Sequence, residues 1–411
     1  MALQDDPISF ENTQYAFEYK SDAALRKARF LFSIMSSSWL VALGTRLTPL
    51  AIRMGLPIKG LLRSTLFSQF VGGETLESTQ AVAASLEHYG VKVILDYGVE
   101  GKEGEENFDQ ATLEFNRVID YAATTSNIPY ISIKITGFAR FGLLEQLQQQ
   151  MLSQSGHLMD RYHAMLAQVD PERRAEWQRV LDRAQRICAN ARDRKVAVAI
   201  DAEESWIQEP VDALATLMMQ QYNQEKPVVY NTVQLYRHDR FRFLQDACTE
   251  SISQNYVLAL KLVRGAYMEK ERKRALEKGY ASPIHANKEA VDLDYNQALS
   301  YCIDRIDRVA VIVASHNEYS NMLATKLLRD KGLSLAHPHI HFSQLYGMSD
   351  NITFNLSKAG ASVSKYLPFG PIEDVVPYLM RRAQENTSVK GQTGRELSLI
   401  QKELERRKQS S

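Results

Sequence analysis

The stretches 256-YVLALKLVRGAY-267 and 309-VAVIVASHN-317 decide the fold of this chain. Each is a nearly continuous apolar run, rich in β-branched residues, that ends in polar or glycine residues. Such runs are typical of a parallel sheet, in which both faces of a strand are buried. Six further runs share the pattern, at Val91–Val99, Tyr130–Phe138, Val196–Glu204, Val228–Tyr236, His339–Met348 and Ser362–Gly370. The sequence therefore predicts eight parallel strands.

Segments with helical periodicity lie between these runs, for example at 108–125 and 318–332. Eight strands that alternate with helices predict an α/β fold, a (βα)8 barrel of the TIM type. A doubly wound open sheet could use the same βα units, but one that binds a dinucleotide usually has a phosphate-binding glycine motif. The sequence contains neither GxGxxG nor GxxxxGK[ST], and we favour the closed barrel.

The barrel is expected to carry helical additions within one elaborated domain, because no Pro/Gly/Ser-rich linker interrupts the chain. Residues 1–85 read as an N-terminal helical region that packs on the barrel, and residues 86–395 as the barrel itself. A long charged helical insertion, residues 140–195, separates the second and third strands. Residues 396–411 are expected to form a charged helix and tail.

The composition limits the partners and the location of the protein. Lys plus Arg number 49 and Asp plus Glu also 49, and zero net charge argues against a surface for nucleic acid. Cys188, Cys248 and Cys302 show neither disulfide nor metal-ligand spacing, which favours a reducing compartment. The N-terminus has no signal-peptide pattern, and polar residues and a proline interrupt the apolar stretch Phe30–Leu50. We expect a cytoplasmic protein without a transmembrane helix, with peripheral contact at the inner face of a membrane left open.

Polar residues end the predicted strands from the second onward, where barrel enzymes have their active sites. These residues are Lys134, Asp201 with Glu203 and Glu204, Gln234, Lys261 with Arg264, Ser315 with His316 and Asn317, Gln344, and Lys365 with Tyr366. A purely structural barrel does not need such a rim. Lys134 within an apolar run is expected to pair with a carboxylate. Asp201 and Glu203 would converge on one strand face, which fits a charge-paired interior about as well as a metal site.

An arginine pair follows the eighth run. Arg381 and Arg382 lie in a predicted helix that begins near Pro371, and Glu385 lies within one turn of both. An exposed salt bridge with Glu385 is the simpler interpretation of the pair by itself. Two adjacent guanidiniums repel, however, unless an anion lies between them, and arginine suits bidentate carboxylate binding.

Together these segments resemble the proline dehydrogenase family. The resemblance extends over roughly residues 90–395 and is carried by IDAEE, KLVRGAY, ASHN, QLYGM, and YLPFGP followed by YLMRRAQEN. The last of these, a Tyr-x-Pro-x-Gly run and then RRxxEN, is the most specific.

The resemblance implies noncovalent FAD along the strand ends. The cofactor residues that it implies are Arg264, Gly265, Ala266, Ser315 and His316 for adenine and pyrophosphate, Ala202 and Gln234 for the isoalloxazine, and in addition Lys261, Lys288, Asn317 and Gln344. Lys261 stands where some family members have arginine, so the bidentate geometry of a guanidinium is lost while the cation near the flavin is kept. No metal is expected.

The resemblance also implies how L-proline would be bound. Its carboxylate would be held by Arg381, Arg382 and Lys134, with Glu385 fixing the arginines; Tyr366, Leu345 and Tyr267 would cover its ring. Asp201 matches the family's active-site aspartate and is expected to stay ionised beside a cation or hydroxyl. A phenol at Tyr366 leaves little room for a 4-hydroxyl group, which favours proline over 4-hydroxyproline.

The implied reaction is hydride transfer from proline C5 to flavin N5, which forms Δ1-pyrroline-5-carboxylate in the first step of proline catabolism to glutamate. Catalytic roles would fall to Asp201, Lys261 and Lys134. Electrons would pass to a quinone, and the apolar helix around Trp39 is a candidate contact with a membrane. Because the chain ends at residue 411, we expect a monofunctional enzyme rather than a fusion with an aldehyde dehydrogenase.

Two other functions fit parts of the sequence. Asp201, Glu203 and His316 around a divalent cation would suit a barrel lyase or aldolase. An inactive barrel that binds an amino acid as a sensor is an alternative of another class.

Overall fold

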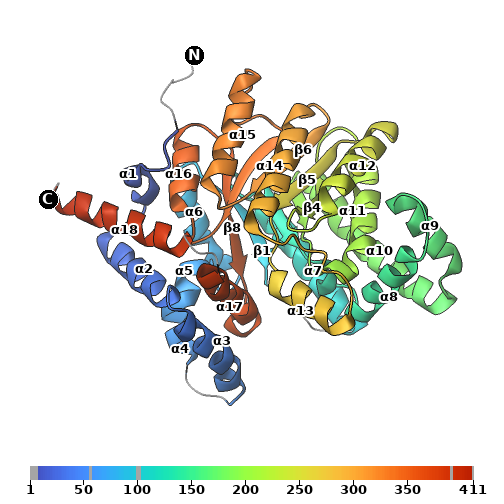
Figure 1. Cartoon of the computed structure of the whole chain (residues 1–411), viewed down its shortest axis with the longest axis horizontal. Coiled ribbons are helices and arrows are strands. Elements are labelled where there is room, and N and C mark those ends of the chain that lie inside the picture. The colour runs from blue at the N-terminus through green and yellow to red at the C-terminus, as the bar shows by residue number, and fades with distance from the viewer. Residues whose placement is uncertain (1–7, 55–57, 99–102, 389–391, 410–411) are drawn as a thin grey trace. The chain divides into compact units, whose positions relative to one another are not determined.

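The structure, a computed structural model, contains a closed eight-stranded barrel with strand order β1 to β8 around its circumference. Figure 1 shows the helices that surround its strands. It describes residues 8–54, 58–98, 103–388 and 392–409; the side chains at 38, 46, 49–53, 385–388, 392 and 393 are left out. The strands are β1 (Lys92–Tyr97), β2 (Tyr130–Ile133), β3 (Ala197–Ile200), β4 (Val229–Gln234), β5 (Leu258–Val263), β6 (Val309–Ala314), β7 (Ile340–Leu345) and β8 (Val363–Phe369). The predicted (βα)8 fold is confirmed.

The strand boundaries differ from the prediction where a run continues past its ladder. The second run was expected to remain extended to Phe138, but β2 ends at Ile133 and Ile135–Gly137 form a 3-10 turn. The amide of Gly137 donates to the carbonyl of Lys134 at 3.0 Å, so this backbone bonds locally rather than to a neighbouring strand. The third run likewise was expected to reach Glu204, whereas β3 ends at Ile200. Lys134 and Asp201 therefore lie just beyond their strands.

Helices alternate with the strands, and two further groups of helices are added to the barrel. The N-terminal group is α1 (Thr13–Phe17), α2 (Asp22–Met35), α3 (Ser38–Arg53), α4 (Lys59–Leu62), α5 (Ser68–Phe70) and α6 (Gln80–His88). The insertion between β2 and β3 is α8 (Phe141–Leu152), α9 (Leu158–Gln168) and α10 (Pro171–Arg194). The others are α7 (Glu105–Ala122), α11 (Gln208–Tyr222), α12 (Arg240–Ser253), α13 (Met268–Lys278), α14 (Lys288–Asp304), α15 (Glu318–Asp330), α16 (Asp350–Lys358), α17 (Ile372–Ser388) and α18 (Gln392–Gln409).

The contacts of the chain divide it into two compact units. One comprises residues 1–98, 316–322 and 342–411, and the other residues 99–315 and 323–341.

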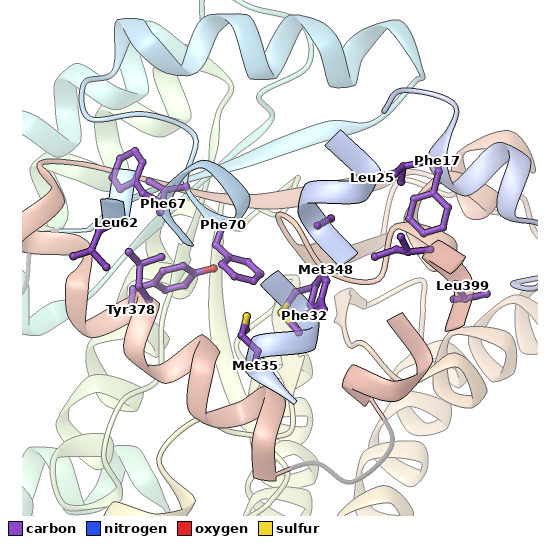
Figure 2. Packing of buried hydrophobic residues seen from close by; sticks show 14 of the residues in the cluster. Phe17, Leu25, Phe32, Met35, Leu62, Phe67, Phe70, Met348, Tyr378 and Leu399 are labelled. Atoms are coloured by element: carbon purple, nitrogen blue, oxygen red, sulfur yellow. The ribbon is translucent and has the colours of Figure 1, made fainter. Parts of the chain in front are cut away.

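The first unit has a core that joins its N-terminal and C-terminal helices. Phe32 and Met35 of α2, Phe70 of α5 and Tyr378 of α17 belong to one buried cluster (Figure 2). The rings of Phe32 and Phe70 meet edge to face, with centroids 6.2 Å apart. Helix α18 packs along α1 and α2, so both ends of the chain help to support this unit.

The helical insertion belongs to the second unit and is held by buried polar contacts as well as by apolar packing. The indole of Trp177 in α10 donates to the hydroxyl of Tyr162 in α9 at 3.0 Å, and both residues are buried. Arg183 of α10 bonds Asp109 of α7 at 2.9 Å and Glu105 at 2.5 Å. These bonds attach the predicted insertion firmly to the barrel's outer helices.

Helices α2 and α3 expose an unusual number of large apolar side chains. Trp39 is 67% exposed and Phe30 62%, and Leu43 and Leu47 are about half exposed. Among the helices described, we find none with the length and apolar character of a membrane span.

Candidate active site

In the second unit, three charged side chains meet at the ends of β2, β3 and β5. Asp201 lies immediately after β3, Lys134 immediately after β2, and Lys261 within β5. The ammonium of Lys134 is 3.5 Å from Oδ2 of Asp201, and the ammonium of Lys261 bonds Oδ1. The hydroxyl of Ser132 donates to Oδ1 of Asp201 at 2.6 Å. The expected pairing of Lys134 with a carboxylate is confirmed.

Asp201 is held in its ionised form by this arrangement. Burial alone would raise the pKa of its carboxyl group, but the charges of Lys261 and Lys134 and the bond from Ser132 outweigh burial and hold the pKa well below its usual range. Lys134 and Lys261 thus bring two ammonium groups to the carboxylate of Asp201.

The loop after β3 is tied to its neighbours by its backbone and side chains. The hydroxyl of Thr136 lies 2.8 Å from both carboxylate oxygens of Glu203. The buried amide of Gln234, at the end of β4, donates to the backbone carbonyl of Glu203 at 2.7 Å. Because β3 ends at Ile200, Asp201 and Glu203 lie in the loop after the strand, and their convergence on one face stays a prediction. Ala202 lies between them, half-buried.

Helix α13 is clamped to the same loop. Glu271, which is fully buried, accepts bonds from both the backbone amide and the hydroxyl of Ser205, each at 2.6 Å. Lys270 pairs with Glu204, and the guanidinium of Arg274 lies over the Trp206 ring, 4.3 Å from its centroid. Tyr267, a predicted substrate residue, is half-buried at the start of this helix.

A second group of cations follows β5 and β6. Arg264 donates to Asp292 at 2.7 Å and to the hydroxyl of Ser315 at 2.8 Å, and Lys288 pairs with the same Asp292. Burial opposes the ionisation of Asp292, but the bonds to Lys288 and Arg264 prevail and lower its pKa. Three predicted cofactor residues, Arg264, Lys288 and Ser315, are therefore joined in one network.

Gly265 follows Arg264 in a conformation that favours glycine. Its φ is +134°, and a Cβ atom added there would lie 2.5 Å from ring atoms of Tyr236. The ring of Tyr236 packs against this glycine. Ala266, the next residue, is exposed.

In the first unit, His316 and Asn317 separate into two roles. A ring nitrogen of His316, Nδ1, lies 2.9 Å from the hydroxyl of Ser349. The side chain of Asn317 accepts the amide of Ser320 at 3.0 Å and so caps α15. The amide of Gln344 is buried and bonds Asn321 at 3.3 Å and Thr353 at 2.8 Å.

Leu345 and Tyr366 stand opposite each other in the ladder between β7 and β8. Both are half-buried. Lys365, the residue before Tyr366 in β8, is fully buried and pairs with Asp350.

The arginine pair lies on α17, in the same unit. Arg382 is only 6% exposed, and its guanidinium carbon is 5.0 Å from the ring centroid of Tyr378; Arg381 is half-buried. Such burial is not that of an ordinary surface ion pair, since charged side chains are rarely buried without a specific reason. The side chain of Glu385, their predicted partner, lies outside the described residues.

Comparison with known proteins identifies the family. The family model described as proline dehydrogenase matches residues 79–395. The chain belongs to the proline dehydrogenase family. Membership makes it an oxidoreductase of proline catabolism, a proline dehydrogenase by activity, as the sequence resemblance implied.

Proline dehydrogenases are among its relatives of nearly full length. Proline dehydrogenase 2, mitochondrial, of Arabidopsis thaliana is 30% identical, over 98% of this chain and 90% of the relative. Hydroxyproline dehydrogenase of Xenopus laevis is 32% identical, over 84% of this chain and 78% of the relative. Carbapenem antibiotics biosynthesis protein CarD of Pectobacterium carotovorum subsp. carotovorum is 34% identical, over 85% of this chain and 86% of the relative. The chain is also similar to proline utilization A of Bdellovibrio bacteriovorus, with TM-score 0.68 and 17% identity, over 93% of this chain and 38% of that one. This last likeness supports the fold.

The side chains of this proline dehydrogenase fit the flavin cofactor of the family. After β4, Nη1 of Arg237 is buried without a hydrogen-bond partner among the described residues. A buried donor of this kind suits a bound polar group. Two residues of this region were not singled out from the sequence: Asp292 and Glu271. Asp292 bonds Arg264, and Glu271 bonds Ser205, across 28 and 66 residues of the chain.

No metal centre is found within the described parts of the chain, where no three His, Cys, Asp or Glu side chains come together as ligands. Glu203 is bonded to Thr136, and His316 to Ser349.

Proposed function

We propose that the enzyme oxidises L-proline at C5 with FAD as cofactor and forms Δ1-pyrroline-5-carboxylate. The observation that carries the proposal is the Asp201–Lys134–Lys261 cluster at the carboxyl ends of barrel strands, in a chain of the proline dehydrogenase family. FAD, when bound, supplies the hydride acceptor. The protein binds and orients L-proline and FAD, and it excludes water from the site.

The cofactor would be held through its phosphates by the network after β5 and β6. Arg264, Lys288 and Ser315 offer a guanidinium, an ammonium and a hydroxyl within one bonded group. The backbone of Gly265 and Ala266 and the ring of His316 would complete the nucleotide site. Asn317 and Gln344 already bond Ser320 and Thr353, and their contact with the cofactor stays a prediction.

The flavin ring would lie against Ala202, Gln234 and Lys261. The ammonium of Lys261 offsets negative charge near the ring, and Asp201 keeps this ammonium in place. Gln234 steadies the loop that carries Ala202 by its bond to the carbonyl of Glu203.

The carboxylate of proline would be bound by cations. Arg381 and Arg382 on α17 supply guanidiniums suited to bidentate binding, and the family resemblance adds Lys134 to them. Orientation by several cations can supply several kcal/mol by holding C5 in a reactive position. Leu345, Tyr366 and Tyr267 offer apolar surface for the ring.

We further propose that electrons pass to a quinone and that α2 and α3 contact a membrane. The exposed side chains Phe30, Trp39, Leu43 and Leu47 support this contact. From residue 23 to residue 73 the chain has seven Lys or Arg and no Asp or Glu, although Lys59 and Arg63 pair with acidic residues elsewhere. Aromatic and aliphatic side chains on a basic background are typical of helices that lie on anionic lipid.

The absorbance of the purified protein tests the main proposal. A flavoenzyme is yellow, and L-proline added without oxygen should bleach its blue absorbance as the flavin is reduced. A colourless protein with a stoichiometric divalent metal would instead support the lyase. A yellow protein that proline never bleaches would support the sensor.

A further inference from the structure

A buried charge network lies in the first unit, apart from the residues proposed to touch substrate. Asp350, at the start of α16, is 2.8 Å from the ammoniums of both Lys20 and Lys365 and accepts the hydroxyl of Tyr19 at 2.8 Å. Lys365 also donates to the carbonyl of Met348 at 2.5 Å. Glu396 of α18 joins the network, buried at 5% exposure.

Glu396 makes one specific bond, to a residue in a strained conformation. Its carboxylate accepts the backbone amide of Ser349 at 2.5 Å. Ser349 has φ +50° and ψ +46°, the left-handed region that residues other than glycine rarely adopt. Backbone strain of this kind costs roughly 1–3 kcal/mol and persists only where surrounding contacts enforce it. The bond from Glu396 is such a contact.

Ser349 passes this constraint to His316. A serine at a helix N-cap usually accepts an amide of its own helix, but the Ser349 hydroxyl makes no such bond to α16 and lies 2.9 Å from Nδ1 of His316. Glu396 of α18 thus contacts Ser349, and Ser349 contacts His316. These contacts fix the orientation of the His316 ring.

We propose that Glu396 is a positioning residue: its carboxylate holds Ser349, and through Ser349 it holds His316 in the orientation that binds the cofactor. The inference rests on the proposed function in one respect, namely that His316 contacts FAD. It assigns the C-terminal helix a role in cofactor affinity, beyond its packing against α1 and α2.

The ionisation of Glu396 makes the role testable by pH. Burial, with the nearby charge of Asp350, raises the pKa of Glu396 to about 7. The charged or titratable groups that face it and its contacts are Asp350 of α16, Lys365 of β8, Lys20 and Tyr19 after α1, Tyr346 after β7, and His316 before α15. The ionised carboxylate is the stronger acceptor for the Ser349 amide, so the hold on His316 tightens as pH rises through this pKa.

Release of flavin from the holoenzyme after dilution, followed by the fluorescence of free FAD, measures the effect. Glu396→Ala should release flavin about tenfold faster than the wild type, since a bond to a charged acceptor is lost. Glu396→Gln keeps an acceptor without charge; it should match the wild type within about twofold near pH 6 and release flavin about fivefold faster near pH 8. Ser349→Ala combined with Glu396→Ala should be no worse than the more severe single variant, because both act on one relay.

Glu403→Ala is the matched control. Glu403 is a second fully buried glutamate of α18, and it bonds Arg406 and Arg407 instead of Ser349. Its loss should lower the melting temperature yet leave the flavin release rate within about twofold of the wild type. The inference would be overturned if Glu403→Ala accelerated flavin release as much as Glu396→Ala does. It would also be overturned if the ratio of the flavin release rates of Glu396→Gln and the wild type stayed constant with pH. A wild-type protein without flavin would instead overturn the proposed function.

Discussion

At the scale of single residues, the pair Arg381 and Arg382 is buried more deeply than a surface ion pair would be. Arg382 is buried beside the ring of Tyr378, and Arg381 is half-buried on the same helix. Guanidiniums are costly to bury, so a pair held in this way is suited to a buried anion rather than to a surface ion pair. In a proline dehydrogenase the carboxylate of the substrate is the natural candidate.

Arg381→Met should raise the KM for proline strongly while leaving the flavin content nearly intact. A lost bond between two charged groups corresponds to roughly 1.5–3 kcal/mol, or about 10- to 100-fold in KM. Steady-state kinetics and the ratio of flavin to protein absorbance measure both quantities. Arg242→Met, which removes an exposed arginine of α12, should change neither. Loss of flavin with an unchanged KM would assign Arg381 to the cofactor instead.

Tyr366→Ser should relax discrimination against 4-hydroxyproline. The phenol of Tyr366 is proposed to fill the space that a 4-hydroxyl group would need, so the ratio of kcat/KM for the two substrates should shift by about tenfold toward hydroxyproline. Tyr366→Phe keeps the bulk and should keep the discrimination. A ratio that stays constant in the serine variant would contradict the steric argument.

At the scale of elements, α13 acts as a clamp on the loop that follows β3. Glu271 holds the backbone and hydroxyl of Ser205, and Lys270 holds Glu204. The same loop carries Asp201 and Ala202, which we place at the flavin. A helix after the fifth strand thereby sets the geometry of a loop after the third.

Glu271→Ala should disturb the flavin environment without removing any residue proposed to touch it. Two buried bonds are lost, which should destabilise the fold by roughly 1–3 kcal/mol and shift the visible absorbance of bound flavin as the loop relaxes. The melting temperature and the flavin spectrum measure the two effects. Glu271→Gln, which keeps an acceptor for the Ser205 amide, should restore much of the spectrum. Glu269→Ala, on the exposed part of α13, is the control, and a wild-type spectrum in Glu271→Ala would refute the clamp.

At the scale of the molecule, the exposed apolar side chains gather in the N-terminal helices. Trp39, Leu43 and Leu47 lie on α3, and Phe30 and Ile34 on α2. An enzyme that delivers electrons to a membrane-dissolved quinone needs a surface of this kind.

Trp39→Glu combined with Leu43→Glu should abolish binding to vesicles that contain phosphatidylglycerol, measured by flotation. Two carboxylates on an apolar face make insertion unfavourable by several kcal/mol and repel the anionic surface. Leu113→Glu combined with Leu293→Glu introduces the same charges at leucines that are similarly exposed elsewhere, and should leave binding unchanged. Equal binding by both double variants would exclude α3 as the contact.

The sequence by itself determined the barrel and the chemical nature of its rim. Eight apolar runs separated by segments with helical periodicity predict the fold, because a strand that is buried on both faces has consecutive apolar residues. The pairing of Lys134 with a carboxylate also followed from an isolated cation in an apolar run. Local rules suffice for such features, since they depend on near neighbours.

Only the tertiary structure decided where the strands end and which charges meet. Ile133 ends β2 although apolar residues continue, because the amide of Gly137 bonds locally. Asp201 meets Lys261 across 60 residues, and Glu396 meets Ser349 across 47. Burial and the charges of distant neighbours determine the ionisation of both carboxyl groups, and neither is visible in the residues beside them. The candidate residues could thus be named from the sequence, but their partners, and the left-handed Ser349 that links α18 to His316, depend on how the chain packs.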